Sequence, residues 1–501
     1  MWRSKKLAII ISYLSIFINM GISLLLTPMY LHALGIETYG LYQMIYAIAS
    51  YILILDFGIG TVLIRFIAEF REKRDANREE SIISYCAILS LIIITCVLIL
   101  GRILDSRLES IYTNLTAGEL ALAHRIFQYL IVTIMLTIVE RYCEGIVMAN
   151  EQFSVAKLIC IVKLLFKLAL AILLLSGNAG ILAILYADLF STAISAGFLS
   201  VHSFYRLKCR IRLHKPEKAL LASAGLFVAA FGLQSVTAYV NNSLGKTLLG
   251  AFLGKTETAV YSLSMTFITI FNMLPTAITG VFLPMATRKV VHNESSRSLT
   301  EMVVETGRVQ FAVCGGFIAG FSLLGRDFIK IWAGTNINEI WLIALIIMLP
   351  NMIPLIQGMC INILDAMNRR MARSLILLAA TVINMVLTYG LIKAIGIWGA
   401  PVGTAISYLV GYGVLMNMYY HKKIGLEVSY MFKGIFFGVT KAIGLAIILT
   451  SPLLLWECRS YLTFIVKGTV FTLIYTVLLY YIGINAKEKA MIRSLIPGYS
   501  R

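Results

Sequence analysis

The chain alternates between apolar stretches of about twenty residues and short polar loops from Leu7 to Ile484. The hydrocarbon core of a bilayer is about 30 Å thick, and about twenty helical residues cross it. Helices are expected, because an open strand would leave backbone polar groups unpaired in lipid. The composition agrees: 59% of the residues are hydrophobic and 14% are charged. The sequence therefore predicts an all-α polytopic membrane protein with about fourteen transmembrane helices.

The fourteen predicted spans fall into two sets of seven. The first set is Leu7–Leu31, Gly40–Gly60, Ile82–Leu100, Ile126–Met148, Val155–Ser176, Ile181–Val201 and Leu220–Asn241. The second set is Val260–Leu283, Phe311–Leu324, Ile340–Ile363, Leu375–Ile395, Ala400–Tyr420, Gly434–Leu455 and Leu462–Ile482.

Lysine and arginine gather at the N-terminus and in every second loop, which predicts the orientation. Cytoplasmic loops carry the excess of these residues, so both termini are expected in the cytoplasm. Much of the +18 net charge then reflects topology, and it gives no reason to expect nucleic acid as a partner. Eight cysteines show no metal-like spacing, and there is no nucleotide-binding Walker A sequence. We expect no cofactor, no metal and no catalytic residue.

Landmarks recur at an offset of 218 or 219 residues, which predicts a duplicated pair of six-helix halves. Equal orientation of both copies is typical of parallel repeats that flank a central path. The expected domains are an N-terminal six-helix lobe (1–205), a basic cytoplasmic linker (206–218), a C-terminal six-helix lobe (219–421), and two additional helices with a cytoplasmic tail (422–501). The landmarks are Leu34-Gly35 with Tyr42 and Leu253-Gly254 with Tyr261, Gly177 to Gly180 and Gly396 to Gly399, and Asn150 and Asn368.

Charged residues inside the fourth and fifth spans are costly in a bilayer and therefore need an explanation. The fourth span carries Glu140, Arg141 and Glu144, and the fifth carries Lys163 and Lys167. A turn near residue 153 would place Glu144 level with Lys163 and Glu140 level with Lys167. These residues are interpreted either as salt bridges that hold the hairpin together or as a charged wall for proton or substrate coupling.

Further in-span charges have a structural and a functional interpretation. Asp56 lies near the end of the second span, either snorkelling or paired near the interface or lining a cavity. Asp188 is deeper in the sixth span and has no obvious local partner. Lys246 follows the polar end of the seventh span, and Lys467 in the last span is expected to snorkel toward the interface.

Polar residues mark the first span of each predicted half. Asn19 belongs to one stripe, and Gln234 and Asn241 belong to the other, while Asn272 extends the set. Such residues commonly hold helices together. Their place on the opening helix of each half also favours a cavity-lining role.

Fourteen spans, a six-plus-six repeat and two trailing helices resemble the multidrug/oligosaccharidyl-lipid/polysaccharide exporter superfamily, and within it the polysaccharide or O-antigen-type flippases. The resemblance covers nearly the whole chain through loosely spaced Gly, Pro and Tyr residues. They are Leu34-Gly35 with Glu37, Gly40 and Tyr42, Asp56 to Gly60 with Arg65 and Ala68, Leu253-Gly254 with Tyr261, Pro284, and Gly396 to Gly403.

The resemblance implies a flippase that moves an undecaprenyl-pyrophosphate-linked oligosaccharide (an O-antigen, capsule or exopolysaccharide unit) across the cytoplasmic (inner) membrane. It implies alternating access driven by H⁺ or Na⁺, the lipid bilayer and a polyprenyl-linked glycan as partners, and glycan polymerases as further partners. The expected substrate or cavity residues are Asn19, Arg141, Lys163, Lys167, Gln234, Asn241, Lys246 and Asn272. The expected ion-coupling residues are Asp56, Glu140, Glu144 and Asp188.

Two other functions compete with this hypothesis. A cation-coupled multidrug antiporter of the same superfamily needs an acidic cavity, whereas the in-span charges here are mixed. A membrane-embedded polysaccharide polymerase needs catalytic groups in sizeable exterior loops, and the longest such segment, Gly101–Arg125, offers only Asp105 and Glu109 as carboxylates near each other. The first span also lacks the arginine that peptidoglycan-precursor flippases place there, which argues against lipid II as cargo. An enzyme is therefore not expected.

Overall fold

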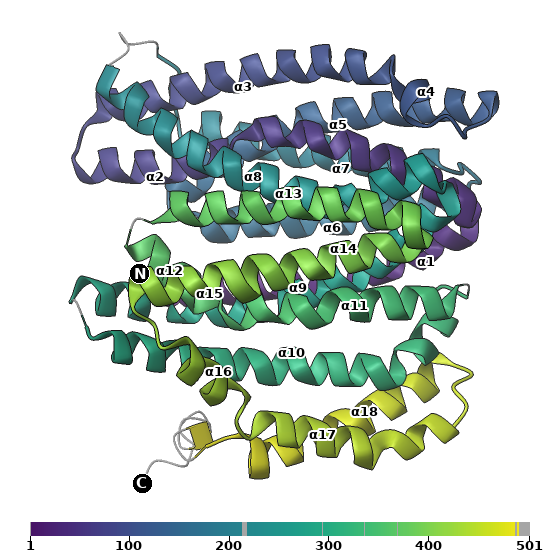
Figure 1. Ribbon diagram of the computed structural model, residues 1–501. Helices are drawn as coiled ribbons and strands as arrows, with labels where there is room; N and C mark the ends of the chain where they lie inside the picture. Colours follow the sequence, from purple (N-terminus) through teal and green to yellow (C-terminus); the bar gives the residue numbers. More distant parts are fainter. Residues whose placement is uncertain are drawn as a thin grey trace. The chain divides into compact units, whose positions relative to one another are not determined.

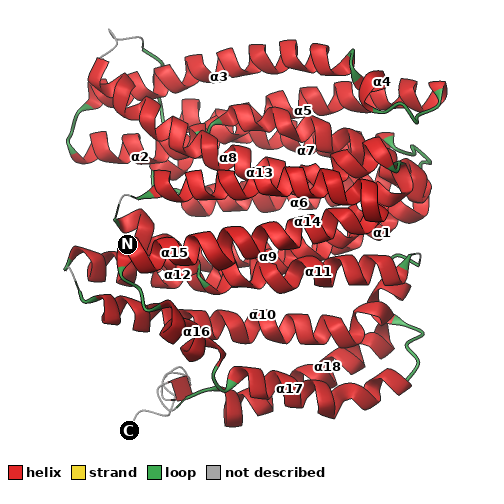
Figure 2. Ribbon diagram, viewed as in Figure 1, coloured by secondary structure: helices red, strands yellow, loops and turns green. Residues whose placement is uncertain are grey.

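The computed structural model describes residues 2–212, 218–292, 294–334, 336–367, 369–485 and 488–489. These residues form helices, turns and loops without a strand (Figure 2). Asn368 of the predicted repeat, part of the predicted linker and most of the tail lie outside the described residues. The chain folds as two compact units, residues 1–262 with 392–400 and residues 263–391 with 401–501, each described by itself below.

Fourteen membrane crossings fit the helices that the structure describes. Eleven helical segments are long and apolar enough to cross a membrane. Two of them, Leu14–Glu72 with 59 residues and Arg370–Ile424 with 55, are each long enough for two crossings. The helix Lys218–Phe252 adds one more. The prediction of an all-α polytopic membrane protein is confirmed.

The first unit contains the following helices, most of which are labelled in Figure 1. They are α1 (Trp2–Ile52), the 3₁₀ turn η1 (Leu53–Asp56), α2 (Ile59–Glu72), α3 (Ala76–Asp105), α4 (Leu108–Ile111), α5 (Ala117–Ala149), α6 (Phe153–Ser176), α7 (Leu182–Val201), the π-helical η2 (His202–Arg206), α8 (Lys218–Phe252) and the start of α9 (Lys255–Val291).

The long helix α1 consists of two crossings joined at Gly35. Gly35 has φ 75°, a left-handed conformation that glycine adopts without a steric penalty, and the chain kinks there. Gly254, its counterpart in the predicted repeat, has φ 114° at the turn between α8 and α9. The other glycine pair differs, since Gly177 has φ −85° and Gly396 has φ 61°. The duplication remains a prediction.

A second break in the helix follows directly after Asp56. Phe57 and Gly58 have φ values of 46° and 69°, which end η1 before α2 begins at Ile59. Helix α2 then packs against α3 and α5. A Cβ atom on Gly60 would lie 2.9 Å from the backbone oxygen of Arg141, so the close approach of α2 to α5 requires glycine.

Helix α7 packs against both α5 and α6, and α1 packs against α5, α6 and α8. This arrangement brings in-span charges from several helices of the first unit together. Helix α5 begins with a capping box, in which Thr116 and Glu119 bond reciprocally to each other's backbone. Its start is thereby fixed at Ala117.

The second unit is built around α10, which packs against α11, α16, α17 and α18. Its apolar core includes Met359, Cys360, Met431 and Ile435, all completely buried. The helices are the remainder of α9, α10 (Ser296–Trp332), α11 (Ile337–Ile356), α12 (Gly358–Ala366), most of α13 (Arg370–Ile395) and of α14 (Gly399–Tyr408), the π-helical η4 (Leu409–Met416), α15 (Asn417–Tyr419), the π-helical η5 (Tyr420–Ile424), α16 (Val428–Phe436), α17 (Val439–Thr450), the 3₁₀ turn η6 (Ser451–Leu455), α18 (Tyr461–Leu478) and the π-helical η7 (Leu479–Gly483). The end of α13, the 3₁₀ turn η3 (Gly396–Trp398) and the start of α14 belong to the first unit.

Two buried cations fasten the last helices to α10. Lys467 of α18 is fully buried and lies 2.6 Å from Asp327, so the expectation that it snorkels was wrong. The predicted ninth span ends at Leu324, before Asp327, and therefore does not include this partner. At the other end of α10, Arg308 bonds to Glu488 and to the backbone oxygens of Gly434 and Gly483.

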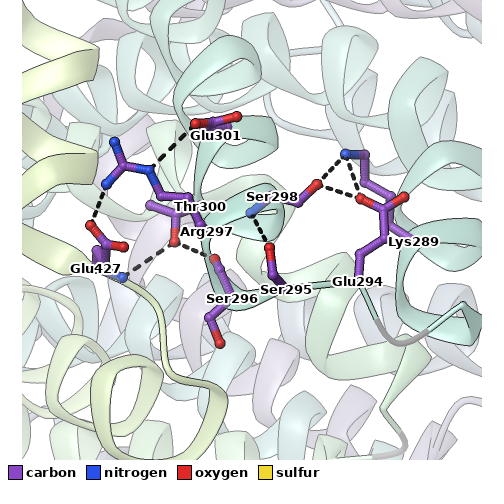
Figure 3. Close-up of polar contacts among 9 residues, drawn as sticks. All are labelled: Lys289, Glu294, Ser295, Ser296, Arg297, Ser298, Thr300, Glu301 and Glu427. Carbon is purple, nitrogen blue, oxygen red and sulfur yellow. Dashed lines mark hydrogen bonds and ion pairs between the residues drawn. The ribbon is translucent and has the colours of Figure 1, made fainter.

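The connection between α9 and α10 is held by a network of polar side chains (Figure 3). Lys289 donates to Glu294 at 2.9 Å and to Ser298 at 2.6 Å. Arg297 binds Glu427 at 2.5 Å, and the backbone N–H of Glu427 donates to Thr300 at 3.2 Å. These contacts tie the first turns of α10 to the segment that leads into α16.

Candidate functional site

Asp56 and Arg141 form an ion pair in the interior of the first unit. Arg141 Nη1 of α5 lies 2.7 Å from Asp56 Oδ2 of η1, and Arg141 Nη2 donates to the hydroxyl of Tyr239 on α8 at 3.0 Å. The sequence predicts that Asp56, near a span end, snorkels, is paired or lines a cavity, and it identifies no partner. The structure pairs Asp56 with Arg141 of α5, which lies 85 residues further along the chain.

Glu140, the neighbour of Arg141, pairs with Lys163 of α6 at 2.6 Å and accepts a hydrogen bond from Ser195 of α7 at 2.5 Å. The expected pairing of Glu140 with Lys167, and of Glu144 with Lys163, was wrong. Helix α5 ends at Ala149 and α6 begins at Phe153, so the turn is centred on residue 151 and the two helices are shifted in register.

Lys167 forms an ion pair with Asp188 of α7, a residue for which the sequence offered no local partner. The hydroxyl of Tyr42 on α1 donates to the same carboxylate at 3.5 Å. Glu144 lies 3.9 Å from Lys157, near the start of α6. The fourth and fifth spans are thus linked to the sixth as well as to each other.

We call the three ion pairs in the centre of this unit the charge cluster. It contains three cations and three carboxylates contributed by η1, α5, α6 and α7: Asp56, Glu140, Arg141, Lys163, Lys167 and Asp188.

In the charge cluster each cation is more exposed than its acid. The Arg141 side chain is 37% exposed against 8% for Asp56, and Lys163 is 24% exposed against 12% for Glu140. Lys167 and Asp188 differ less, at 27% and 24%. Asp56 and Glu140 are therefore less exposed than the cations that pair with them, whereas Asp188 is about as exposed as Lys167. More exposed cations favour an anion over an organic cation as the ligand of such a site.

Lys246 of α8 is a cation without an acidic partner in the described part of the chain. Its ammonium donates to Gln43 of α1 at 3.1 Å, and Gln43 in turn donates to Tyr39 at 2.9 Å. A neutral amide oxygen leaves the positive charge uncompensated. Lys246 is therefore a cation of the first unit that no acid balances among the described residues.

Tyrosines lie around the charge cluster, although none is among the site residues predicted from the sequence. Tyr46 is 40% exposed although its neighbours on the same stretch of α1 are largely buried, and it lies near Arg141, Asp188 and Tyr239. Tyr42 is buried and bonds to Asp188. The spacing of Tyr39, Tyr42 and Tyr46 on one helical face was the available signal.

The other predicted cavity residues are scattered. Asn19 of α1 is half-buried and Gln234 of α8 is exposed, and neither hydrogen-bonds through its side chain to another described residue. Asn241 is half-buried in α8. Asn272 belongs to the second unit, where it accepts a hydrogen bond from Asn351 at 2.6 Å. Among the described residues, Asn19 and Gln234 are thus not joined to the charge cluster by a side-chain hydrogen bond.

Solved structures with similar folds are transport proteins. One is the lipid II flippase MurJ in an inward closed conformation, with a TM-score of 0.71, 12% identity, and 97% of this chain and 98% of that chain covered. Another is an inward-facing multidrug resistance MATE transporter, with a TM-score of 0.62, 16% identity, and coverages of 80% and 92%. A third is a transporter of the MOP superfamily from Pyrococcus furiosus, with a TM-score of 0.59, 16% identity, and coverages of 83% and 96%. At these identities the likeness shows the fold alone.

Sequence comparison points to one branch of this superfamily. No curated protein matches the chain at a significant level. A family model described as polysaccharide biosynthesis protein matches residues 7–290, more than half of the chain. The resemblance found in the sequence to the multidrug/oligosaccharidyl-lipid/polysaccharide exporter superfamily is confirmed. This chain belongs to the polysaccharide biosynthesis protein family.

Proposed function

We propose that this protein is a flippase that moves an undecaprenyl-pyrophosphate-linked oligosaccharide from the cytoplasmic to the outer leaflet of the cytoplasmic membrane. The cargo would be a repeat unit of O-antigen, capsule or exopolysaccharide, and both termini would lie in the cytoplasm. A diphosphate and a sugar chain cannot cross hydrocarbon unaided, because their polar groups lose their hydration there. The protein provides a polar path while the lipid tail stays in the bilayer.

The observation that carries this proposal is the arrangement of the charge cluster. Its cations are more exposed than its acids, and Lys246 adds a charge that no acid balances among the described residues. Lysine and arginine are suited to diphosphate oxygens. In this proposal Arg141, Lys163, Lys167 and Lys246 bind the diphosphate.

The cycle is proposed to be alternating access driven by an H⁺ or Na⁺ gradient, with no cofactor. Acidic groups available for ion coupling are Glu140, Glu144 and Asp188, along with Asp56. Asn19, Gln234, Asn241 and Asn272 are proposed to line the glycan path. Glycan polymerases are the proposed downstream partners.

A cation-coupled multidrug antiporter is the second candidate, because MATE transporters share the fold. That transporter corresponds to 80% of this chain, whereas the lipid II flippase corresponds to 97%. An organic cation would also meet the exposed cations before their acids. Both observations favour an anionic cargo.

The test is a leaflet assay in cells that lack the gene. We expect the lipid-linked oligosaccharide to accumulate on the cytoplasmic face of the membrane and re-expression to relieve the accumulation. Normal outward display of the glycan, together with altered sensitivity to cationic dyes, would contradict the proposal and favour the antiporter.

A further inference from the structure

Arg141 is held in place by two partners, yet much of its hydrogen-bonding capacity is unused. A guanidinium has five N–H donors, and the described residues accept from two of its nitrogens, through Asp56 Oδ2 and Tyr239. Its side chain is 37% exposed. The remaining donors can therefore bind a ligand that reaches Arg141.

Asp56 is the incompletely satisfied member of the pair. The residue is 6% exposed, and its Oδ1 atom is buried without a hydrogen-bond partner among the residues that the structure describes. A buried carboxylate oxygen is expected to be hydrogen-bonded. Asp56 is the last residue before the helix break at Phe57 and Gly58. Its other carboxylate oxygen, Oδ2, is held by Arg141.

Tyrosines from two helices also lie beside this pair. Helix α8 contributes Tyr239, and α1 contributes Tyr46. Helices α2 and α3 pack in this region as well, and their ionisable residues include Arg65 of α2 and Tyr85 and Cys86 of α3. In the described part of the chain Arg141 is the residue that forms an ion pair with Asp56.

We infer that Arg141 forms an anion subsite for phosphate oxygens and that Asp56 is a built-in competitor for it. The inference rests on the proposed function, since the anion is the diphosphate of the cargo lipid. Carboxylate and phosphate oxygens bind the same fork of guanidinium donors. The anion binds donors of Arg141 that Asp56 leaves free, and the Asp56 carboxylate, which shares the guanidinium with the anion, partly neutralises its charge and repels the anion. Asp56 thereby keeps the subsite weak enough for release.

Coupling between two sites is reciprocal, so neutralising Asp56 must strengthen anion binding. The test uses the purified full-length protein in nanodiscs and farnesyl diphosphate as the probe, with the dissociation constant measured by calorimetry. We expect Asp56→Asn, which keeps the size and one oxygen acceptor, to bind the probe about fivefold more tightly or better. Arg141→Ala should weaken binding. In the double variant Asp56→Asn/Arg141→Ala, the gain from the first substitution should vanish.

The matched control is Asp105→Asn, which removes one carboxylate paired with His124 at 2.7 Å and lies outside the charge cluster. It should leave the dissociation constant unchanged, and thermal melting confirms that each variant is folded. Equal binding by wild type and Asp56→Asn, or a gain that persists without Arg141, overturns the inference. The proposed function then stands if the wild type binds the probe. If no folded protein, the wild type included, binds farnesyl diphosphate, both the inference and the proposed function are contradicted.

Discussion

Arg141 of α5 lies 2.7 Å from Asp56 at the end of a broken helix, and the arginine side chain is more exposed than the carboxylate. The same difference in exposure holds between Lys163 and Glu140. Charges inside a membrane protein are costly unless they are paired or functional. Here the pairing reduces the cost of burial, and the exposed cations remain available to a ligand.

Lys246 is the residue at which an effect on transport can best be distinguished from an effect on stability. Its partner is the neutral Gln43, so Lys246→Gln leaves no carboxylate unpaired and should keep normal membrane abundance. Export of the glycan should fall, whereas Lys246→Arg should retain most of it. Glycan display and immunoblotting of membranes measure the two quantities. Full export by Lys246→Gln would remove this residue from the proposed diphosphate site.

Lys163 and Lys167 are expected to affect transport more than abundance. Lys163→Ala and Lys167→Ala each remove a cation from the charge cluster, and glycan export should fall by more than membrane abundance does. Lys157→Ala is the control on the same helix, because its contact with Glu144 is long at 3.9 Å. Equal losses of export and abundance in the cluster variants would leave these lysines a structural role alone.

Lys467 should matter for stability. Removing its charge leaves Asp327 without the cation that now pairs with it at 2.6 Å. Breaking a buried pair costs about 3–5 kcal/mol, whereas replacing both members by neutral groups costs much less. We expect Lys467→Met to lower the melting temperature of the purified protein and Asp327→Asn in the same chain to restore part of the loss. If the single and double variants have the same melting temperature, loss of the Lys467–Asp327 pair is not the cause of the destabilisation.

Gly145 tests the close packing of α2 on α5. A Cβ atom there would lie 2.7 Å from the Cα atom of Gly60, so Gly145→Ala forces the two helices apart. Overpacking of this kind costs about 1–3 kcal/mol. Gly197→Ala in α7 is the control, because nothing lies within 4 Å of its added methyl group. In thermal unfolding, Gly145→Ala should have a lower melting temperature than Gly197→Ala. Equal melting temperatures would contradict the close approach of α2 to α5.

The contact between Glu294 and Ser298 should weaken in acid. Hydrogen bonds from Ser298 and Lys289 lower the pKa of Glu294. A carboxylate with a lowered pKa stabilises the fold above its ordinary pKa, and this stabilisation is lost as the pH falls through the lowered value. Amide exchange in the first turn of α10, corrected for its intrinsic pH dependence, should therefore rise in acid. In Glu294→Gln the protection should be reduced already at neutral pH and should change little with acidification.

The fold was predictable because the length of an apolar helix is set by bilayer thickness, and this works without knowing any tertiary contact. Partners of the buried charges were less accessible to prediction. The Glu140–Lys163 pair depends on a turn centred two residues earlier than assumed. Asp327 was placed outside the membrane, which hid the partner of Lys467. Asp56 and Arg141 are 85 residues apart in the sequence, and no periodicity of the sequence indicates such a contact.

The most direct test of the account is transport by the purified protein in proteoliposomes that contain an undecaprenyl-diphosphate-linked oligosaccharide. An added enzyme that modifies only the glycan in the outer leaflet reports movement between leaflets. We predict that protein under an imposed ion gradient makes nearly all of the glycan lipid accessible, while protein-free liposomes expose only the outer-leaflet share. No movement of the glycan lipid under H⁺ or Na⁺ gradients, with extrusion of a cationic dye by the same vesicles, would contradict the account.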